Sequence, residues 1–128
     1  KDETDVVNYY NQAAQLYHPG ALHALGILHH RAGKLEKSYE YFVSAAMNGN
    51  VDSQFNLMAH HLNGEIAEKN IGKAYVWGMI ASNNKDQKAK EIIEKDILPK
   101  LSPESIENWN KLISTFEENP ESFYKEIV

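Results

Sequence analysis

The six histidines are the side chains of this sequence with the clearest chemical potential, and four of them form two doublets. His29-His30 lies in the apolar run LHALGILHHRAG (22–33), and His60-His61 lies in QFNLMAHHLNGE (54–65). Imidazole is the commonest metal ligand and a general base near neutral pH. The doublets are therefore either parts of a metal or catalytic site, or one structural unit that occurs twice.

The spacing of the histidines fits no known metal-site template. A zinc site needs three or four ligands that converge on one point, whereas His23 and His30 lie two turns apart and Glu65 falls in a turn. The His-Glu-x-x-His pattern, a glycine-rich phosphate loop, an EF-hand run and a Gly-x-Ser-x-Gly elbow are all absent. Thiolate ligands and nucleophiles are excluded because the sequence has no cysteine. We expect no catalytic residue, no metal and no cofactor.

Composition excludes further classes of function. The 128 residues are 42% hydrophobic and 24% charged, which is typical of one folded domain. The net charge is −5, and Leu101–Val128 carries six acidic residues against two lysines, so we expect no nucleic-acid partner. No apolar run approaches the roughly twenty residues that span a bilayer, so we expect no membrane insertion.

The compartment stays open at this stage. A chain without cysteine suits a bacterial periplasm or cytoplasm equally well. The sequence starts at Lys1 without methionine, so we expect that an upstream portion, such as a signal peptide, was removed or left out.

Self-comparison shows an internal repeat. A shift of 32 residues places Tyr9, Tyr10, Ala13, Ala14 and Leu25 on Tyr41, Phe42, Ala45, Ala46 and Leu57, and a shift of 36 places Lys37-Ser38-Tyr39 on Lys73-Ala74-Tyr75. Each unit reads as two short helices, A and B, joined by a turn.

The apolar spacing and the capping signals predict an all-helical chain. Gly33 and Gly64 end the A helices, and Ser102-Pro103 and Asn119-Pro120 read as the N-cap and first position of later helices. The predicted helices are 5–17, 21–31, 35–47, 52–62, 71–82, 86–98, 103–118 and 121–128.

The same spacing predicts which residues are buried. We expect three core stripes: Leu22, Leu25, Leu28 and His29; Leu35, Tyr39, Phe42, Val43 and Ala46; and Trp109, Leu112, Ile113 and Phe116. The third stripe should close the end of the helix stack.

The repeat resembles the Sel-one-like repeat (SLR) family, which is related to tetratricopeptide repeats. The resemblance rests on Leu25-Gly26, the glycine stop and the later Lys-Ser/Ala…Ala-Ala pattern, and on the long turn Gly64-Glu-Ile-Ala-Glu-Lys-Asn70 before Lys73-Ala74. It implies a right-handed α-α superhelix, a solenoid of antiparallel helix pairs in a single domain. Its expected parts are an N-terminal half-repeat (1–20), two repeats (21–50 and 51–85), and a degenerate repeat with capping helices (86–128).

Four positions depart from the family pattern. His29 and His61 stand where the family has tyrosine, Met58 stands where it has glycine, and Asn70 stands where it has aspartate. We interpret both histidines as half-buried rings that make a hydrogen bond, and the doublets as an echo of duplication.

The resemblance implies a function as well as a fold. The A helices of such a superhelix line a concave wall that binds partners. A non-enzymatic protein–protein interaction module is expected, with a protein or peptide partner and no small-molecule ligand; bacterial adaptors, scaffolds and toxin-neutralising (immunity-type) proteins look like this. The expected wall residues are His23, Ile27, His30, Arg31, Phe55, Asn56, Ala59, Leu62, Asn63, Glu91 and Lys95.

Two alternatives remain open. The histidine cluster could serve a cell-wall-related hydrolase or a metal-binding protein. The chain could also be a fragment of a longer repeat array, in which case the helix at 5–17 would expose an apolar patch.

Overall fold

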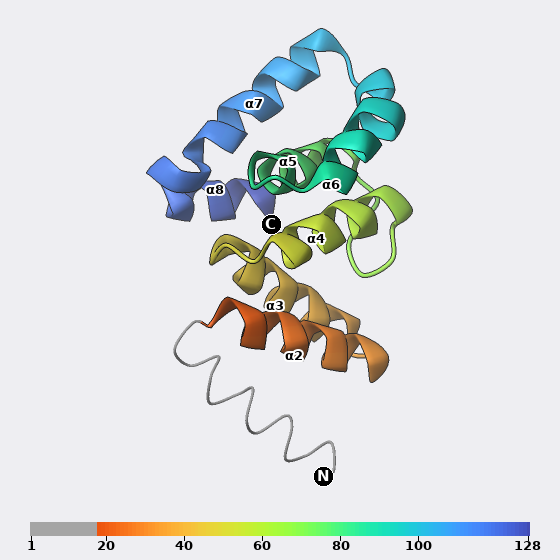
Figure 1. The fold of residues 1–128 in the computed structure, drawn as a ribbon, viewed down its shortest axis with the longest axis vertical. Helices are drawn as coiled ribbons and strands as arrows, with labels where there is room; N and C mark the ends of the chain where they lie inside the picture. The colour runs from red at the N-terminus through yellow and green to blue at the C-terminus, as the bar shows by residue number, and fades with distance from the viewer. Residues whose placement is uncertain (1–17) are drawn as a thin grey trace. The chain divides into compact units, whose positions relative to one another are not determined.

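A computed structural model describes residues 18–128, and those residues are helical without a strand. The expectation of an all-helical chain is therefore confirmed for this part, while the predicted helix at 5–17 lies outside the described residues. Figure 1 shows the helices α2 (Pro19–Arg31), α3 (Leu35–Met47), α4 (Val51–Asn63), α5 (Ile71–Asn83), α6 (Gln87–Ile92), α7 (Pro103–Glu118) and α8 (Pro120–Ile127).

The predicted capping signals place the helix ends correctly. The Ser102 side chain accepts a hydrogen bond from the backbone N–H of Ser105, at 3.1 Å, and so caps α7. Gly33 and Gly64 follow α2 and α4 with φ values of +77° and +70°, a left-handed conformation that glycine adopts without strain. Six of the seven α-helices of residues 18–128 begin and end within two residues of the predicted bounds, because these signals are local, and α6 is the exception.

The chain divides into two compact units, residues 1–53 and 54–128. In the described part of the first unit, α2 and α3 pack as an antiparallel hairpin (Figure 1). Gly26 of α2 meets the Phe42 ring of α3, and the Ser38 hydroxyl donates a 2.7 Å hydrogen bond to the Gly26 carbonyl. The close approach of the two backbones explains why small residues occupy this contact.

One predicted core residue of this hairpin is misplaced. Leu35 is 42% exposed at the start of α3, whereas Ser38 in the same helix is fully buried. The apolar side chain of Leu35 predicts burial, but the position of α3 that contacts α2 is that of Ser38. This contact needs a small side chain that can donate a hydrogen bond to a backbone carbonyl.

Helix α5 is the centre of the second unit. Eight of its residues are buried, as expected for a helix that neighbours cover on several sides. Gly72 faces Trp109 of α7, and Gly78 faces Met58 of α4 and Ile93. Met58 is buried, so the bulk that it adds to α4 is accommodated by a glycine on the facing helix.

The predicted continuous helix at 86–98 changes its winding. It starts as α6 (Gln87–Ile92), continues as a π-helix (Ile93–Ile97) and ends in a 3-10 turn (Leu98–Lys100). In the π segment the N–H of Leu98 donates to the carbonyl of Ile93. Pro99 lacks an N–H and its ring collides with the preceding turn, so the α-helical pattern cannot continue here.

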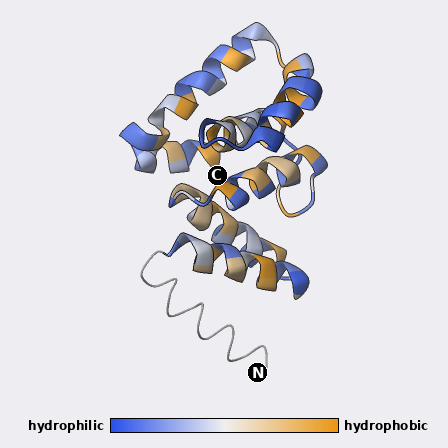
Figure 2. Cartoon of the chain, viewed as in Figure 1, coloured by the Kyte–Doolittle hydropathy of each residue, from blue (hydrophilic) through white to orange (hydrophobic). Residues whose placement is uncertain are grey.

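The C-terminal helices close this unit by an aromatic cluster. Trp77, Phe116 and Phe123 meet edge to face, with ring centroids 5.0 Å apart for Phe116 and Phe123 and 5.5 Å apart for Trp77 and Phe123. Phe123 and Ile127 of α8 are fully buried, while the predicted α7 stripe is only half-buried. Figure 2 shows the alternating hydrophilic and hydrophobic residues along α7. Helix α8 therefore supplies the fully buried part of this closure, for which the sequence pointed to the apolar stripe of α7.

No helix among residues 18–128 has both the length and the apolar character needed to cross a membrane.

Candidate functional site

His29 and His61 occupy equivalent places in their helices and make the same kind of contact. The Nδ1 atom of His29 lies 2.8 Å from the carbonyl oxygen of Leu25, and its ring lies 5.0 Å from that of Tyr41. The Nδ1 atom of His61 lies 2.8 Å from the carbonyl oxygen of Glu68. The interpretation of both as packed, hydrogen-bonded rings is confirmed, although His61 is fully buried rather than half-buried.

His23, an expected wall residue, packs inside the first unit. Its Nδ1 atom lies 2.6 Å from the hydroxyl of Ser53, and its ring lies 5.4 Å from that of Phe42. Burial lowers the pKa of His23, and the negative charge of Asp52 partly opposes that shift. A serine hydroxyl against an imidazole is the arrangement of a nucleophile and its base. Ser53 is fully buried, however, so a substrate carbonyl has no access to its hydroxyl.

Of the other two doublet histidines, His60 lies near a carboxylate. The Nδ1 atom of His60 lies 3.9 Å from a carboxylate oxygen of Glu65, which follows α4. In the part of the chain from His18 onward, no three histidine or acidic side chains form a group that could hold a metal ion.

The other wall residues fall on helix stripes. On α2, Ile27 is half-buried and His30 and Arg31 are exposed, at the i, i+3, i+4 spacing of one face. On α4, the half-buried residues Phe55, Ala59 and Leu62 share one stripe, and Asn56 and Asn63 share the next. Glu91 on α6 and Lys95 in the π segment are both exposed.

The buried face of α4 lies beside this stripe. Gln54, Leu57, Met58 and His61 are the buried residues of α4 in the second unit. Phe55, Ala59 and Leu62 (the α4 stripe) form an adjacent apolar stripe that is less buried than this face.

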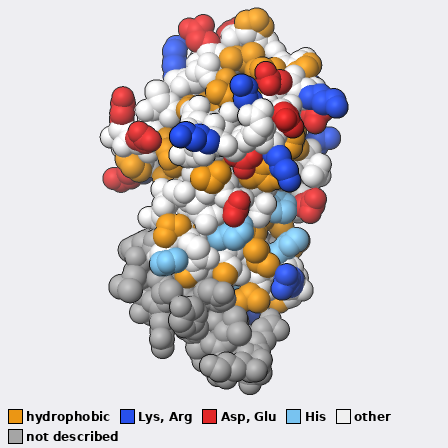
Figure 3. Space-filling view, viewed as in Figure 1, with side chains coloured by type: hydrophobic (Ala, Val, Ile, Leu, Met, Phe, Trp, Pro, Cys, Tyr) orange, Lys and Arg blue, Asp and Glu red, His pale blue; other side chains and the backbone are white. Residues whose placement is uncertain are grey.

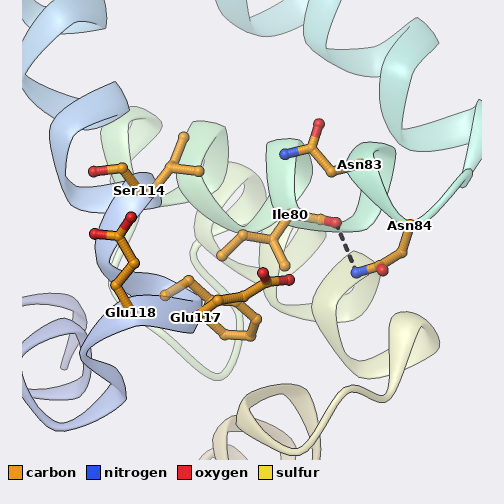
Figure 4. A pocket seen from close by; sticks show the side chains of 8 residues that line it. Ile80, Asn83, Asn84, Ser114, Glu117 and Glu118 are labelled. Carbon is orange, nitrogen blue, oxygen red and sulfur yellow. Dashed lines mark hydrogen bonds between the residues drawn. The ribbon is translucent and has the colours of Figure 1, made fainter.

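Sequence reasoning missed a pocket of about 310 Å³ at the C-terminal ends of α5 and α7. Figure 4 shows Asn84 closing one side, where its side-chain Nδ2 donates a 3.0 Å hydrogen bond to the carbonyl of Ile80. Neither helix has a basic residue in its last turn, but α3 lacks one as well, so the sequence carries no signal specific to this pocket. The lining comprises the polar residues Asn83, Asn84, Ser114, Glu117 and Glu118 and the apolar residues Ile80, Ile113 and Phe116.

A second, more open hollow of about 630 Å³ lies at the turn between α2 and α3. Its lining includes His29, the exposed Leu35, and lysine and glutamate side chains of both signs. The mixed charge gives this hollow no clear preference for a charged ligand.

No protein-family model matches the chain, and no curated protein matches it. The fold and the contacts above define the class as an all-helical protein with packed neighbouring helix pairs.

Proposed function

We propose that this protein is a non-enzymatic protein-binding module of the SLR type, in which helix pairs stack into a right-handed superhelix and the A helices line its binding wall. The observation that carries the proposal is the α4 stripe: Phe55, Ala59 and Leu62 are apolar, only half-buried, and lie beside the buried face of their helix. The histidine contacts support the proposal, because the hydrogen bonds of His23, His29 and His61 to groups inside the fold give these rings a structural role.

The composition of the α4 stripe suits a protein or peptide ligand. An interface typically has apolar and aromatic anchors at its centre and a polar rim. Phe55 and Leu62 supply such anchors, and Asn56 and Asn63 supply amide groups beside them. On α2, Ile27 with His30 and Arg31 offers the same combination of an apolar centre and a polar edge.

The repeat chemistry supports the SLR assignment. Gly26 lies against Phe42 and Gly78 lies against Met58, so a glycine takes part in the packing of both helix pairs. The turn that precedes α5 is capped by Asn70, whose side chain accepts a 2.9 Å hydrogen bond from the N–H of Lys73. An adaptor, a scaffold or a toxin-neutralising protein would use this architecture in the same way.

A capture experiment tests the proposal. The wild-type chain and an Ile27→Glu/Phe55→Glu variant are immobilised and exposed to native lysate, and bound proteins are identified by mass spectrometry. The matched control is Leu35→Glu/Tyr124→Glu, which adds the same charges at apolar positions that are 42% and 47% exposed. Partners captured by the wild type and the control but lost from the first variant support the proposal. Equal capture by all three proteins contradicts it, provided that thermal melts show all three folded.

The histidine-based alternative, a cell-wall-related hydrolase or a metal protein, draws on one specific observation. That observation is the 2.6 Å contact between His23 and Ser53. We expect the combined variant His23→Gln/His30→Ala/His60→Ala to keep partner binding. If the wild type hydrolyses cell-wall glycans or peptides and this variant does not, the binding-module proposal is wrong.

A further inference from the structure

The ends of two helices meet at the pocket between α5 and α7. Asn83 is the last residue of α5, and Glu117 and Glu118 are the last residues of α7. The final carbonyl groups of a helix lack intrahelical partners and carry the negative end of its dipole. Two such ends therefore contribute negative potential to one small cavity.

The side chains add charge of the same sign. Among the described residues, Glu117 and Glu118 are the only charged ones that line the pocket. Both are exposed at a helix C-terminus, where a cation is favoured. No ion pair engages either carboxylate within the described part of the chain. Figure 3 shows how acidic side chains gather at the corner where α7 meets α8.

No lysine or arginine of the described residues lines the pocket. Lys85 follows Asn84 directly but is exposed and is not among the lining residues. The N-terminal end of α8, which begins at Pro120, likewise contributes no residue to the lining.

The floor is apolar and partly aromatic. Ile80, which Figure 4 shows between Glu117 and Asn84, is buried, and the lining residues Ile113 and Phe116 are half-buried. A ligand that fits must therefore combine a positive, hydrogen-bonding end with an apolar or stacking body. Arginine has both, since its planar guanidinium pairs with carboxylate and amide oxygens and also stacks on aromatic rings.

We propose that this pocket binds the side chain of an arginine presented by a partner protein. The carboxylates of Glu117 and Glu118 and the amide oxygen of Asn83 would receive the guanidinium, and Phe116 and Ile113 would contact its stem. None of the residues that line this pocket is a wall residue of α2 or α4, so the arginine proposal can fail without affecting the proposed function, and the reverse is also true.

Titration of the full chain, followed by amide NMR, tests the proposal. The probes are N-acetylarginine amide, a glycine-flanked arginine pentapeptide, its lysine counterpart, N-acetylcitrulline amide and spermidine. We expect both arginine probes to shift the Asn83 and Ser114 resonances in a saturable way that high salt suppresses. Citrulline, which has the shape of arginine without its charge, should cause no shift.

Variants identify the groups responsible. Glu117→Gln/Glu118→Gln should weaken arginine binding by about two- to thirtyfold, the range expected for two partly exposed ion pairs. The control Glu107→Gln removes a carboxylate from the same helix, one that pairs with Lys111 at 3.9 Å, and should leave binding unchanged. The double variant should melt no lower than the wild type, because it removes negative charge from a helix C-terminus.

The proposal is overturned by any of four results. These are no shift at Asn83 and Ser114, equal weakening in the control variant, equal binding of citrulline or the lysine peptide, and binding of spermidine without binding of the arginine pentapeptide. The last result would indicate a free polyamine site instead.

Discussion

The Nδ1 atom of His61 lies 2.8 Å from the carbonyl oxygen of Glu68, seven residues further along the chain. The backbone carbonyl of His61 also accepts a 2.9 Å hydrogen bond from the N–H of Asn70. One histidine thus holds the long turn between α4 and α5 by both its side chain and its backbone. His61 therefore has a structural role that requires neither a metal nor a substrate.

Stability should fall as the pH drops below about 6.5. Burial lowers the pKa of His61 and that of His23 from the ordinary value of 6.5, so the unfolded chain takes up protons more readily than the folded one. The stabilisation from both neutral rings is fully present above 6.5 and is lost as the pH falls through the lower folded values. Urea unfolding at several pH values between about 7.5 and 5.5 measures this slope.

The variant His61→Gln isolates one contribution to that slope. Glutamine can still donate to the Glu68 carbonyl but does not titrate, so the slope between about pH 6.5 and 5.5 should become shallower. An unchanged slope would mean that other groups cause the pH dependence. Glu68 titrates at lower pH, because its hydrogen bond to Lys73 lowers its pKa from 4.5.

Gly26→Leu should lower the free energy of unfolding by about 1–3 kcal/mol. A Cβ atom at Gly26 would lie 2.8 Å from the Phe42 ring, so a larger side chain must displace that ring or separate α2 from α3. Chemical denaturation measures the change. The control Ala32→Leu adds the same bulk at an exposed position just after α2 and should change stability far less. Equal stability of Gly26→Leu and wild type would rule out tight packing here.

Phe123→Ala should be among the most damaging single changes in the second unit. Phe123 is fully buried against Trp77 and Phe116, and truncation of a buried phenylalanine costs about 3–5 kcal/mol. Trp77 fluorescence should shift to the red in thermal or denaturant melts as water reaches its ring. The neighbouring Tyr124 is 47% exposed, and Tyr124→Ala should stay within about 0.5 kcal/mol of wild type. A mild effect at Phe123 would show that α8 does not close this unit.

Asn70→Ala should cost about 1 kcal/mol by removing the N-cap of α5. The side-chain oxygen of Asn70 accepts a hydrogen bond from the N–H of Lys73, which alanine cannot replace. Asn70→Asp keeps that acceptor and adds a negative charge at the helix N-terminus, so its stability should equal or exceed that of the wild type. Loss of stability in both variants would indicate that the amide group has another essential role.

The sequence by itself determined the helices and most of their ends. Ser102, Asn119, Gly33 and Gly64 act on the few residues beside them, so their effect is local and can be read without knowledge of distant contacts. The structural interpretation of His29 and His61 was also accessible from the sequence, because duplicated positions are expected to share one packing role.

Only the tertiary structure decided which surfaces are buried and where the pocket lies. Ser38 is buried and Leu35 is exposed because the contact with α2 favours a small hydrogen-bonding side chain, which hydrophobicity alone does not reveal. The pocket combines the last turns of α5 and α7, which are far apart in the sequence. Neither helix end forms a pocket by itself. Their shared negative field exists only after packing brings the two helix ends together, and no local pattern of residues encodes that meeting.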